Sequence, residues 1–260
     1  MFKKKTETKS PLKARPLRLP GQSIDDELNE YFLDKLLFPY ILATMFWLIT
    51  GLEWWRHYKD VPPNPWFFTF VSMCITAYAA AVIIRRWKHL KQLKLGREGE
   101  RAVGQFLDRL SVDGYRVFHD VVTGDANIDH VLVGPNGVFS VETKTLSKPS
   151  RGKAVITVRH DTVEANGRPL TRNPIPQAKA QAAWLRAFLS EAEFDSFVQP
   201  VVAFPGWYVN PFDHRAIGTW VLEPKAIPAF IGNLPQRLSA EQISAITSSL
   251  SSYVRANAAK

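Results

Sequence analysis

The chain has 260 residues, of which 46% are hydrophobic and 12% aromatic, and these values exclude a disordered or collagen-like protein. The length fits one or two domains with a sizeable core, and the single cysteine, Cys74, excludes a disulfide framework or a cysteine-rich zinc site. The formal net charge is +9, which at first suggests a nucleic-acid-binding protein. What this charge means depends on where it lies.

Most of the positive charge lies in two short runs. Residues 1–20 carry +6 and residues 85–97 carry another +6, whereas residues 21–84 carry −4 and residues 98–260 carry only +1. The large C-terminal region is therefore nearly neutral, and the net charge of the whole chain is no evidence by itself for nucleic-acid binding.

Residues 1–35 predict a basic cytoplasmic tail that ends in a short amphipathic helix. Residues 23–26 (Ser-Ile-Asp-Asp) resemble a capping box that opens this helix. Its apolar positions would suit a membrane surface. These positions are Ile24, Leu28, Tyr31 and Phe32.

Residues 36–84 predict a transmembrane helical hairpin. The segments 36–54 and 66–84 are each close to the roughly 20 apolar residues that cross a bilayer core, and the second contains no charged residue. Tryptophans near their ends are typical of interfacial anchors. A buried hairpin in a soluble core is the alternative, but nothing else in the chain is long or apolar enough to cover both helices.

The basic residues around this hairpin predict its orientation. The loop at 56–65 carries two Lys or Arg, against seven in the N-terminal residues 1–20 and six in the basic juxtamembrane helix 85–97. By the positive-inside rule both termini lie in the cytoplasm, and no cleaved signal peptide is expected. We therefore expect a two-span, multi-pass protein of the inner (plasma) membrane of a bacterium, with anionic lipid of the cytoplasmic face as a partner.

Residues 98–260 predict an α/β domain with the order α-β-β-β-α-β and an α/β C-terminal extension. A helix ends at Gly114, and the turn at 134–137 (Gly-Pro-Asn-Gly) closes a hairpin. Residues 146–173 are expected to hold a smaller hairpin with its turn at Asn166-Gly167. Further helices begin at Pro174 or Pro176 and, with a Ser-Ala-Glu-Gln cap, at Ser239. The expected strands are residues 115–122, 128–133, 138–145, 197–204 and 217–222.

Four residues of this domain form a possible catalytic group: Glu100, Asp129, Glu142 and Lys144. Glu142 and Lys144 are two residues apart on one strand and share a face. The hairpin turn allows three registers. If the residue numbers of each cross-strand pair sum to 271, Asp129 lies opposite Glu142, and if they sum to 273, Asp129 lies opposite Lys144. If they sum to 272, Asp129 lies on the other face of the sheet from Glu142 and Lys144.

Two carboxylates opposed across a strand pair repel each other unless a cation compensates. A hard divalent ion, Mg²⁺ or Mn²⁺, takes carboxylate oxygens and activates water toward a phosphodiester. Lys144 would orient the water or stabilise developing negative charge, and Glu100 would position the lysine or the water. A solvated strand face with a surface ion pair is the alternative interpretation.

The pattern Asp129…Glu142-Thr143-Lys144 resembles the PD-(D/E)xK nuclease motif, and its surroundings resemble the nuclease-related domain family, NERD. The resemblance covers about residues 94–205 and implies a restriction-endonuclease-like fold with metal-dependent nuclease chemistry, in which Asp129, Glu142 and the Thr143 carbonyl bind the metal. Ile128 stands where the motif has proline, which affects only backbone geometry. The segments that carry the resemblance are 96–100 (Gly-Arg-Glu-Gly-Glu), 127–130 (Asn-Ile-Asp-His), 133–139, 141–144 and Arg172-Asn173-Pro174 with Gln177.

Arg172 and Gln177 are candidates for substrate contact, with helix entry and ordinary surface as the alternatives. Residues 142–186 carry +6 and would form a basic lip for a phosphate backbone, or else an ordinary charged loop. His130 points to the opposite strand face from Asp129, and we expect it to pack or hydrogen-bond there.

The sequence thus predicts a membrane-anchored, Mg²⁺-dependent nuclease that acts on nucleic acid, with DNA as the expected polymer. One alternative is a non-catalytic module, tethered to the membrane, that binds nucleic acid or a partner. Another is a membrane scaffold whose hairpin drives oligomerisation. The sequence does not indicate an oligomeric state.

Overall fold

The computed structural model describes residues 17–59, 64–124, 127–149, 152–194, 196–212 and 214–257. Most of the basic tail (residues 1–16) and Arg151 of the predicted basic lip lie outside these ranges. The chain forms two compact units, of which one comprises residues 22–97 and the other joins the N-terminal segment up to Gly21 to residues 98–260.

The first unit consists of long helices. Helix α1 (Gln22–Tyr31) continues through a π-helical segment, η1 (Phe32–Leu37), into α2 (Phe38–Tyr58), so the expected amphipathic helix and the first apolar segment are continuous. Helix α1 begins directly after Gly21, whose φ of 71° is left-handed. Ser23 therefore lies inside the first turn, and the prediction that it opens the helix was wrong by one residue.

The face of α1 that we expected at a membrane surface packs in part against helix α3 (Pro65–Asp108). Leu28 is buried, and the Tyr31 ring lies 5.3 Å from the His89 ring, whereas Phe32 is 54% exposed. An ion pair of 3.0 Å joins Asp25 to Arg97. The acidic α1 thus partners the basic stretch of α3, which the charge pattern of either segment alone did not reveal.

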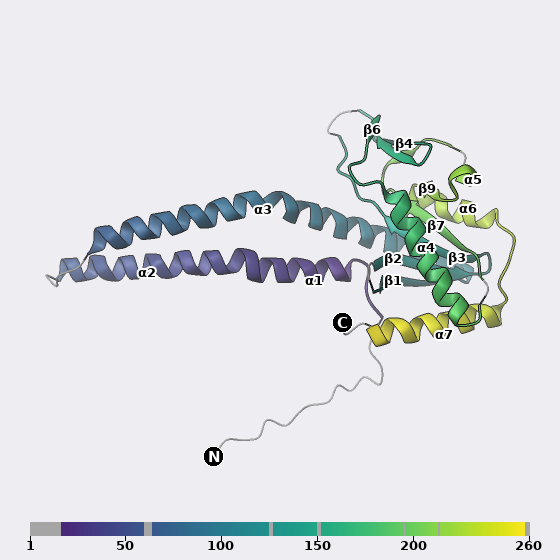
Figure 1. Ribbon diagram of the computed structural model, residues 1–260, viewed down its shortest axis with the longest axis horizontal. Coiled ribbons are helices and arrows are strands. Elements are labelled where there is room, and N and C mark those ends of the chain that lie inside the picture. Colours follow the sequence, from purple (N-terminus) through teal and green to yellow (C-terminus); the bar gives the residue numbers. More distant parts are fainter. Residues whose placement is uncertain are drawn as a thin grey trace, which may run out of the picture. The chain divides into compact units, whose positions relative to one another are not determined.

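Helices α2 and α3 of this unit lie side by side and antiparallel (Figure 1). Hydroxyl and indole groups join them. The Thr50 and Ser72 hydroxyls are 2.6 Å apart, and the indole Nε1 atoms of Trp47 and Trp54 donate to the hydroxyls of Thr76 and Thr69 at 2.9 and 3.2 Å. The Thr50–Ser72 contact is buried, and polar contacts of this kind between helices with apolar outer faces are typical of helix pairs in membranes.

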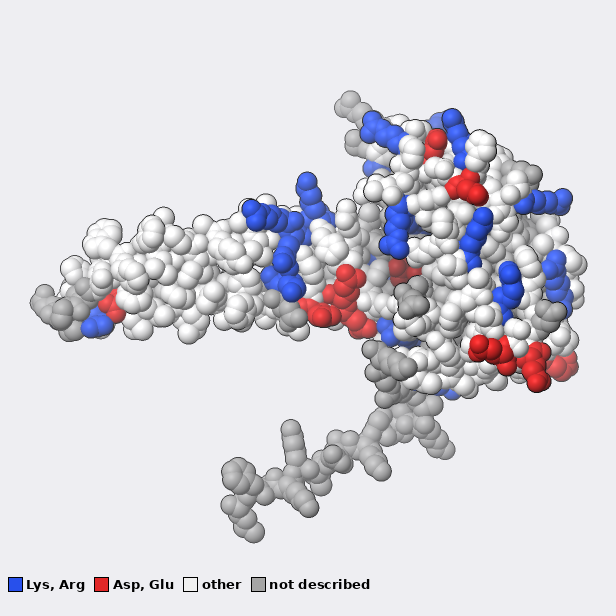
Figure 2. Space-filling view, viewed as in Figure 1, with Lys and Arg blue, Asp and Glu red and all other residues white. Residues whose placement is uncertain are grey.

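Only one helix in the described part of the chain, Pro65–Asp113, is long and apolar enough to cross a membrane. Only 11% of its apolar window is buried, so it is not an ordinary core helix. Helix α2 is not among the candidate spans of the described residues. On the face drawn in Figure 2, the hairpin carries almost no charge between its tip and the region of α1. One helix of the described residues thus has the length and composition of a membrane span, and the two-span hairpin is still only a prediction.

The second unit is a mixed α/β domain built on a five-stranded sheet with the order β1-β2-β3-β7-β9. Strands β1 to β3 are antiparallel, and β3, β7 and β9 are parallel. A smaller sheet has the order β6-β5-β4-β8. The strands of the large sheet are β1 (Arg116–Val122), β2 (Asn127–Gly134), β3 (Gly137–Thr143), β7 (Val198–Ala203) and β9 (Trp220–Leu222). Those of the small sheet are β4 (Val155–Arg159), β5 (Thr162–Ala165), β6 (Arg168–Pro169) and β8 (Tyr208–Val209).

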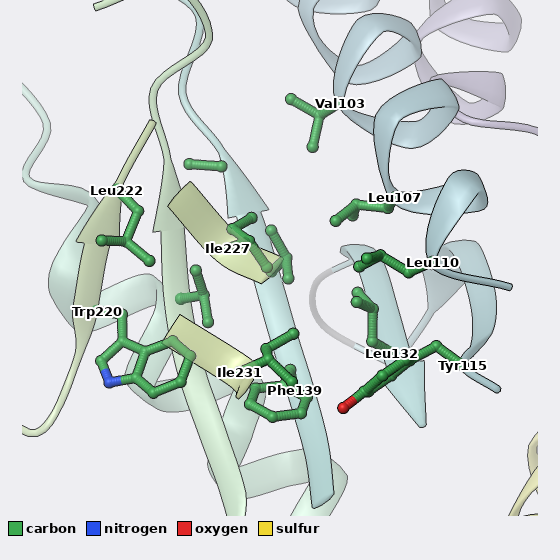
Figure 3. Close-up of a cluster of buried hydrophobic side chains, with 13 residues drawn as sticks. Val103, Leu107, Leu110, Tyr115, Leu132, Phe139, Trp220, Leu222, Ile227 and Ile231 are labelled. Carbon is green, nitrogen blue, oxygen red and sulfur yellow. The ribbon is translucent and has the colours of Figure 1, made fainter. Parts of the chain in front are cut away.

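Helices cover both faces of the large sheet. The end of α3 and the 3-10 segment η2 (Arg109–Asp113) pack on one face, and α4 (Pro174–Glu191) and α7 (Ala240–Asn257) on the other. Figure 3 shows the core on the α3 face, where Val103, Leu107 and Leu110 meet Leu132 and Phe139. The remaining short elements are α5 (His214–Ile217), η3 (Pro224–Ala226) and α6 (Ile227–Gly232).

The predicted order α-β-β-β-α-β is confirmed, and so is the cap of the last helix, where the Ser239 and Gln242 side chains exchange hydrogen bonds with each other's backbone N–H. The predicted hairpin turn at Asn166-Gly167 is confirmed, and it joins β5 to β6. A further tight turn at His160, whose φ is 52°, joins β4 to β5, so residues 155–159 do not lead directly into the Asn166-Gly167 turn. One detail was wrong. The last strand starts at Trp220 because Gly218, with φ of 67°, interrupts the extended backbone.

Candidate active site

The register of β2 and β3 decides whether the two motif carboxylates can meet. His130 pairs with Val141 and Leu132 pairs with Phe139, so paired residue numbers sum to 271. Of the three registers that the sequence allowed, this one places Asp129 opposite Glu142 when the pattern is continued by one pair.

The turn that sets this register is fixed by its surroundings. Gly134 pairs with Gly137 around a two-residue loop, and a Cβ on Gly134 would lie 2.2 Å from the Tyr115 ring. The Tyr115 hydroxyl donates to the Asn136 side chain, and the Asn136 amide donates to the Leu234 carbonyl at 2.7 Å. The Gly-Pro-Asn-Gly segment therefore has a packing reason for its residues as well as a turn preference.

Asp129 is held against the end of β3. Its Oδ2 accepts a hydrogen bond from the Thr143 backbone N–H at 2.7 Å. Burial raises the pKa of Asp129 well above its usual range, and the neighbouring Glu142 and Glu100 carboxylates raise it further, while the Thr143 N–H opposes the rise.

Glu142 is buried, and the side chains around it come from α4, from the residues just before α4 and from the segment after β3. Its Oε2 accepts a hydrogen bond from the Gln181 amide at 2.7 Å, and the same amide donates to the Asn127 carbonyl at 2.8 Å. Burial raises the pKa of Glu142, and Gln181, Lys144, Arg172 and Gln177 counteract this rise. The structure thus brings together the predicted Lys144, Arg172 and Gln177 around Glu142.

Glu100 approaches the same carboxylates from α3. Burial, then Asp120 and Glu142, raise its pKa to about 8. The preceding Gly99 permits this approach, because a Cβ there would lie 1.7 Å from the Thr145 hydroxyl oxygen just beyond β3. The Gly-x-x-Gly-Glu segment therefore positions Glu100 by close packing.

A fourth carboxylate, Asp120, was not predicted. It lies on β1 between two residues whose partners on β2 flank Asp129, and its φ of 49° is left-handed. Its side chain is buried and its Oδ2 accepts from Arg18 Nε at 2.7 Å. The sequence feature that could have indicated Asp120 as a site residue is its position as an acid inside a mostly apolar strand. Arg18 had been assigned to the lipid-facing basic run, so its pairing with a buried acid corrects that assignment for this one residue.

No group of three or more His, Cys, Asp or Glu side chains that could hold a metal ion occurs among the residues that the structure describes. The donor set of Asp129, Glu142 and the Thr143 carbonyl nevertheless fits Mg²⁺ or Mn²⁺ by its chemistry, since these ions prefer oxygen ligands. The Glu142 carboxylate raises the pKa of both Asp129 and Glu100, and a cation would relieve this repulsion. The buried Gln181 Oε1 has no hydrogen-bond partner and lies on the side chain that contacts Glu142.

A second buried polar cluster lies on the α3 face of the same strands. The Nδ1 atoms of His119 and His130 are 2.9 Å apart, and His119 Nε2 lies 2.9 Å from Asp108 Oδ1. Burial, and then His119, lowers the pKa of His130 well below its usual range, so this histidine is neutral in the fold. The prediction that His130 hydrogen-bonds on the face opposite to Asp129 is confirmed.

Comparison with known proteins agrees with the resemblance seen in the sequence. The family model described as "Nuclease-related domain", NERD, matches residues 95–205, so the chain contains a nuclease-related domain. An uncharacterized protein of Bacillus anthracis is 40% identical over 62 residues, which are 22% of this chain and 29% of that relative. The match therefore spans less than a third of the relative's length. No solved structure matches the chain.

Proposed function

We propose that this protein is a membrane-anchored, metal-dependent nuclease that hydrolyses phosphodiester bonds of nucleic acid, with DNA as the expected polymer. The observation that carries the proposal is the group of neighbouring carboxylates within a nuclease-related domain, in which Glu142 is buried and Asp129 and Glu100 are partly buried. Neighbouring acids whose pKa values are raised by burial and by one another's charge, as for Asp129 and Glu100 beside Glu142, reduce stability, and such arrangements cluster at catalytic sites. The α-β-β-β-α-β order is that expected for a restriction-endonuclease-like core.

Each residue has a proposed role. Asp129, Glu142 and the Thr143 carbonyl hold Mg²⁺ or Mn²⁺, and the Gln181 and Gln177 amides orient Glu142. A bound ion supplies Lewis-acid chemistry, lowering the pKa of water and neutralising charge on the phosphodiester. Lys144 orients the attacking water or stabilises the developing negative charge. Glu100 positions the lysine or the water, and Arg172 contacts a substrate phosphate.

Membrane anchoring is the second part of the proposal. The α3 span and α2 together form a two-span hairpin in the inner (plasma) membrane of a bacterium, with both termini in the cytoplasm. Exposed apolar side chains support this, among them Leu52 at 63%, Phe70 at 67% and Ile84 at 72%. The basic residues 85–97 at the cytoplasmic side favour anionic lipid. Protease protection in sealed inverted vesicles tests the topology, which predicts cleavage of both termini and protection of the hairpin.

Cleavage of labelled DNA by the full chain in detergent with Mg²⁺ tests the activity. Removing Lys144 as Lys144→Ala, or the metal-binding charge as Asp129→Asn, should each lower the cleavage rate by about 100-fold or more. Lys225→Ala, at a side chain 81% exposed, is the matched control and should cut like the wild type. Unchanged cleavage by both site variants would exclude this assignment.

A non-catalytic module that binds nucleic acid or a partner at the membrane is the second candidate. It is favoured by the absence of a three-residue metal cluster among the described residues. Titration with Mn²⁺ distinguishes the two candidates: nucleic-acid binding without any metal binding would favour the module.

A further inference from the structure

A basic pocket lies beside α4, away from the carboxylates. It has a volume of about 530 Å³, and residues of α4, β7, α5 and β9 line it. Lys179 and Arg186 are seven residues apart on α4, two turns along one flank. Gln177 and Gln181, which contact Glu142, lie on the opposite flank by helical periodicity. The pocket is therefore separate from the site described above.

The charged side chains that line the pocket are all positive. Three of its lining side chains are cationic, Lys179, Arg186 and Arg215, and none of its lining residues is acidic. Lys179 lies 3.6 Å from Asp161 in a pair that is exposed on both sides, and such pairs contribute little and exchange readily with another anion. The pocket thus has the electrostatic character of an anion site.

An aromatic ring stands at the same place. Phe197 lines the pocket and is 53% exposed, and the guanidinium groups of Arg186 and Arg237 lie 5.9 and 5.4 Å from its ring. Aromatic rings and guanidinium planes together are the platform on which unpaired bases stack. A site for a simple anion would not need such a ring.

We propose that this pocket binds one phosphorylated nucleotide unit, with the phosphate on Lys179, Arg186 and Arg215 and the base on Phe197. The volume lies within the range of about 300–1,000 Å³ that is usual for small-molecule sites. The unit comes either from a nucleic-acid strand or from a free nucleotide, and the experiment below distinguishes the two.

As a strand subsite, the pocket rests on the proposed nuclease function and deepens it. Gln199, which lines the pocket, pairs with Phe139, three positions before Glu142 on β3. The separation along the strand is about 10 Å. The subsite would hold the strand a few nucleotides from the scissile bond, and would give the nuclease a preference for an unpaired base at that distance.

The test measures oligonucleotide binding without metal, so that cleavage of the oligonucleotide cannot affect the result. Full-length protein in detergent with EDTA is titrated into a fluorescein-labelled 12-nucleotide oligothymidylate, and fluorescence anisotropy gives the dissociation constant. Phe197→Ala and Arg186→Ala should each weaken binding by about tenfold, as expected for loss of one stacked base or one phosphate contact. Arg186→Ala should also reduce the salt slope by about 0.7, while Phe197→Ala leaves the slope unchanged.

Arg255→Ala, an exposed arginine on α7, is the matched control and should bind like the wild type. Thermal unfolding must show each variant folded, and Arg186→Lys, which keeps the charge, should retain most of the salt slope. Displacement of the oligonucleotide by thymidine monophosphate assigns a free nucleotide to the pocket. No displacement by the monophosphate, with variant-sensitive oligonucleotide binding, assigns a strand.

Unchanged oligonucleotide affinity in both pocket variants would overturn the proposal, and so would displacement of the oligonucleotide by inorganic phosphate at the same concentrations at which thymidine monophosphate displaces it. The result is separable from the proposed catalysis. If Asp129→Asn abolishes cleavage but binds the oligonucleotide normally in EDTA, the pocket and the nuclease site stand independently. If wild-type protein binds through the pocket yet never cleaves with Mg²⁺ or Mn²⁺, only the nuclease assignment fails.

Discussion

The two faces of the same three strands hold two buried polar clusters of opposite character. Asp129 and His130 are neighbours on β2, and Asp120 and His119 are neighbours on β1, so alternation along each strand separates the acids from the histidines. On the α3 face, His130 contacts His119, and His119 contacts Asp108 near the surface. On the other face, Glu142 contacts Gln181 of α4, and the Glu142 carboxylate raises the pKa of Asp129.

The two clusters differ in how far hydrogen bonds compensate the free-energy cost of burying their polar groups. In the histidine cluster, His119 contacts both His130 and Asp108, and only the buried Nε2 of His130 is without a hydrogen-bond partner among the described residues. The carboxylates retain repulsion that hydrogen bonds from Thr143 and Gln181 only partly relieve. A fold that keeps such repulsion gives up stability at that place, and this is the usual sign of a functional site. We therefore expect the histidine cluster to be structural and the carboxylate cluster to be catalytic.

The largest expected effect on stability comes from the ion pair of Asp120. Arg18 and Asp120 side chains are only 10% and 4% exposed, so Arg18→Ala leaves a buried charge without this partner. The free energy of unfolding should fall by about 3 kcal/mol. Urea unfolding of the full chain in detergent measures this, with Arg18→Lys as the charge-keeping control. A loss below about 1 kcal/mol would show that the N-terminal segment does not contribute in this way.

The pH dependence of stability should differ between the two clusters. Because the folded pKa of Glu100 is raised from 4.5 to about 8, the folded state binds more protons than the unfolded state across this interval. Stability without metal therefore falls as pH rises from about 5 to 8, by at most about 1.4 kcal/mol per pH unit for each such group. Thermal unfolding in EDTA should show this slope, and Glu100→Gln should reduce it. A slope that does not change in Glu100→Gln would contradict the raised pKa.

The histidine cluster should produce the opposite slope at low pH. His130 has a folded pKa well below its usual value, so the unfolded state binds more protons below about pH 6.5 and stability falls as pH falls. His130→Leu should remove this acid dependence and cost about 1–2 kcal/mol, because the His119 contact is lost. Cleavage should stay within about twofold of wild type. A large loss of cleavage in a folded His130→Leu protein would break the distinction between the two clusters.

The smallest expected effect is an increase in the free energy of unfolding. Asp129→Asn keeps an oxygen that can accept from the Thr143 N–H but removes a negative charge beside Glu142 and Glu100. At pH 8 without metal, unfolding should require about 1 kcal/mol more. Thermal unfolding of this variant beside His130→Leu compares the two clusters directly. Destabilisation by Asp129→Asn at this pH would mean that the carboxylate is structural.

Much of the site follows from local patterns in the sequence. Strand alternation and the Gly-Pro-Asn-Gly turn limit the register to three choices, and one of these is observed. The helix that begins at Pro174 brings Gln177 to Glu142 because it covers β3. Each of these inferences depends on residues within a few tens of positions of one another.

The rest depends on contacts that no local pattern encodes. Arg18 and Asp120 are 102 residues apart, and the left-handed φ of Asp120 is not a conformation that an aspartate inside an apolar strand predicts. The contact of Tyr31 with α3 likewise arises between segments that each resembled a membrane-surface element. The His119–His130 contact requires the β1–β2 register, which no strong turn signal fixed.

The central claim, that Asp129 and Glu142 form a metal site, is tested most directly by calorimetric titration of Mn²⁺ into the full chain in detergent. The account predicts one ion bound per chain in the wild type and in His130→Leu, and binding at least about tenfold weaker in Asp129→Asn. Absence of binding in the wild type, or equal binding in Asp129→Asn, would contradict it.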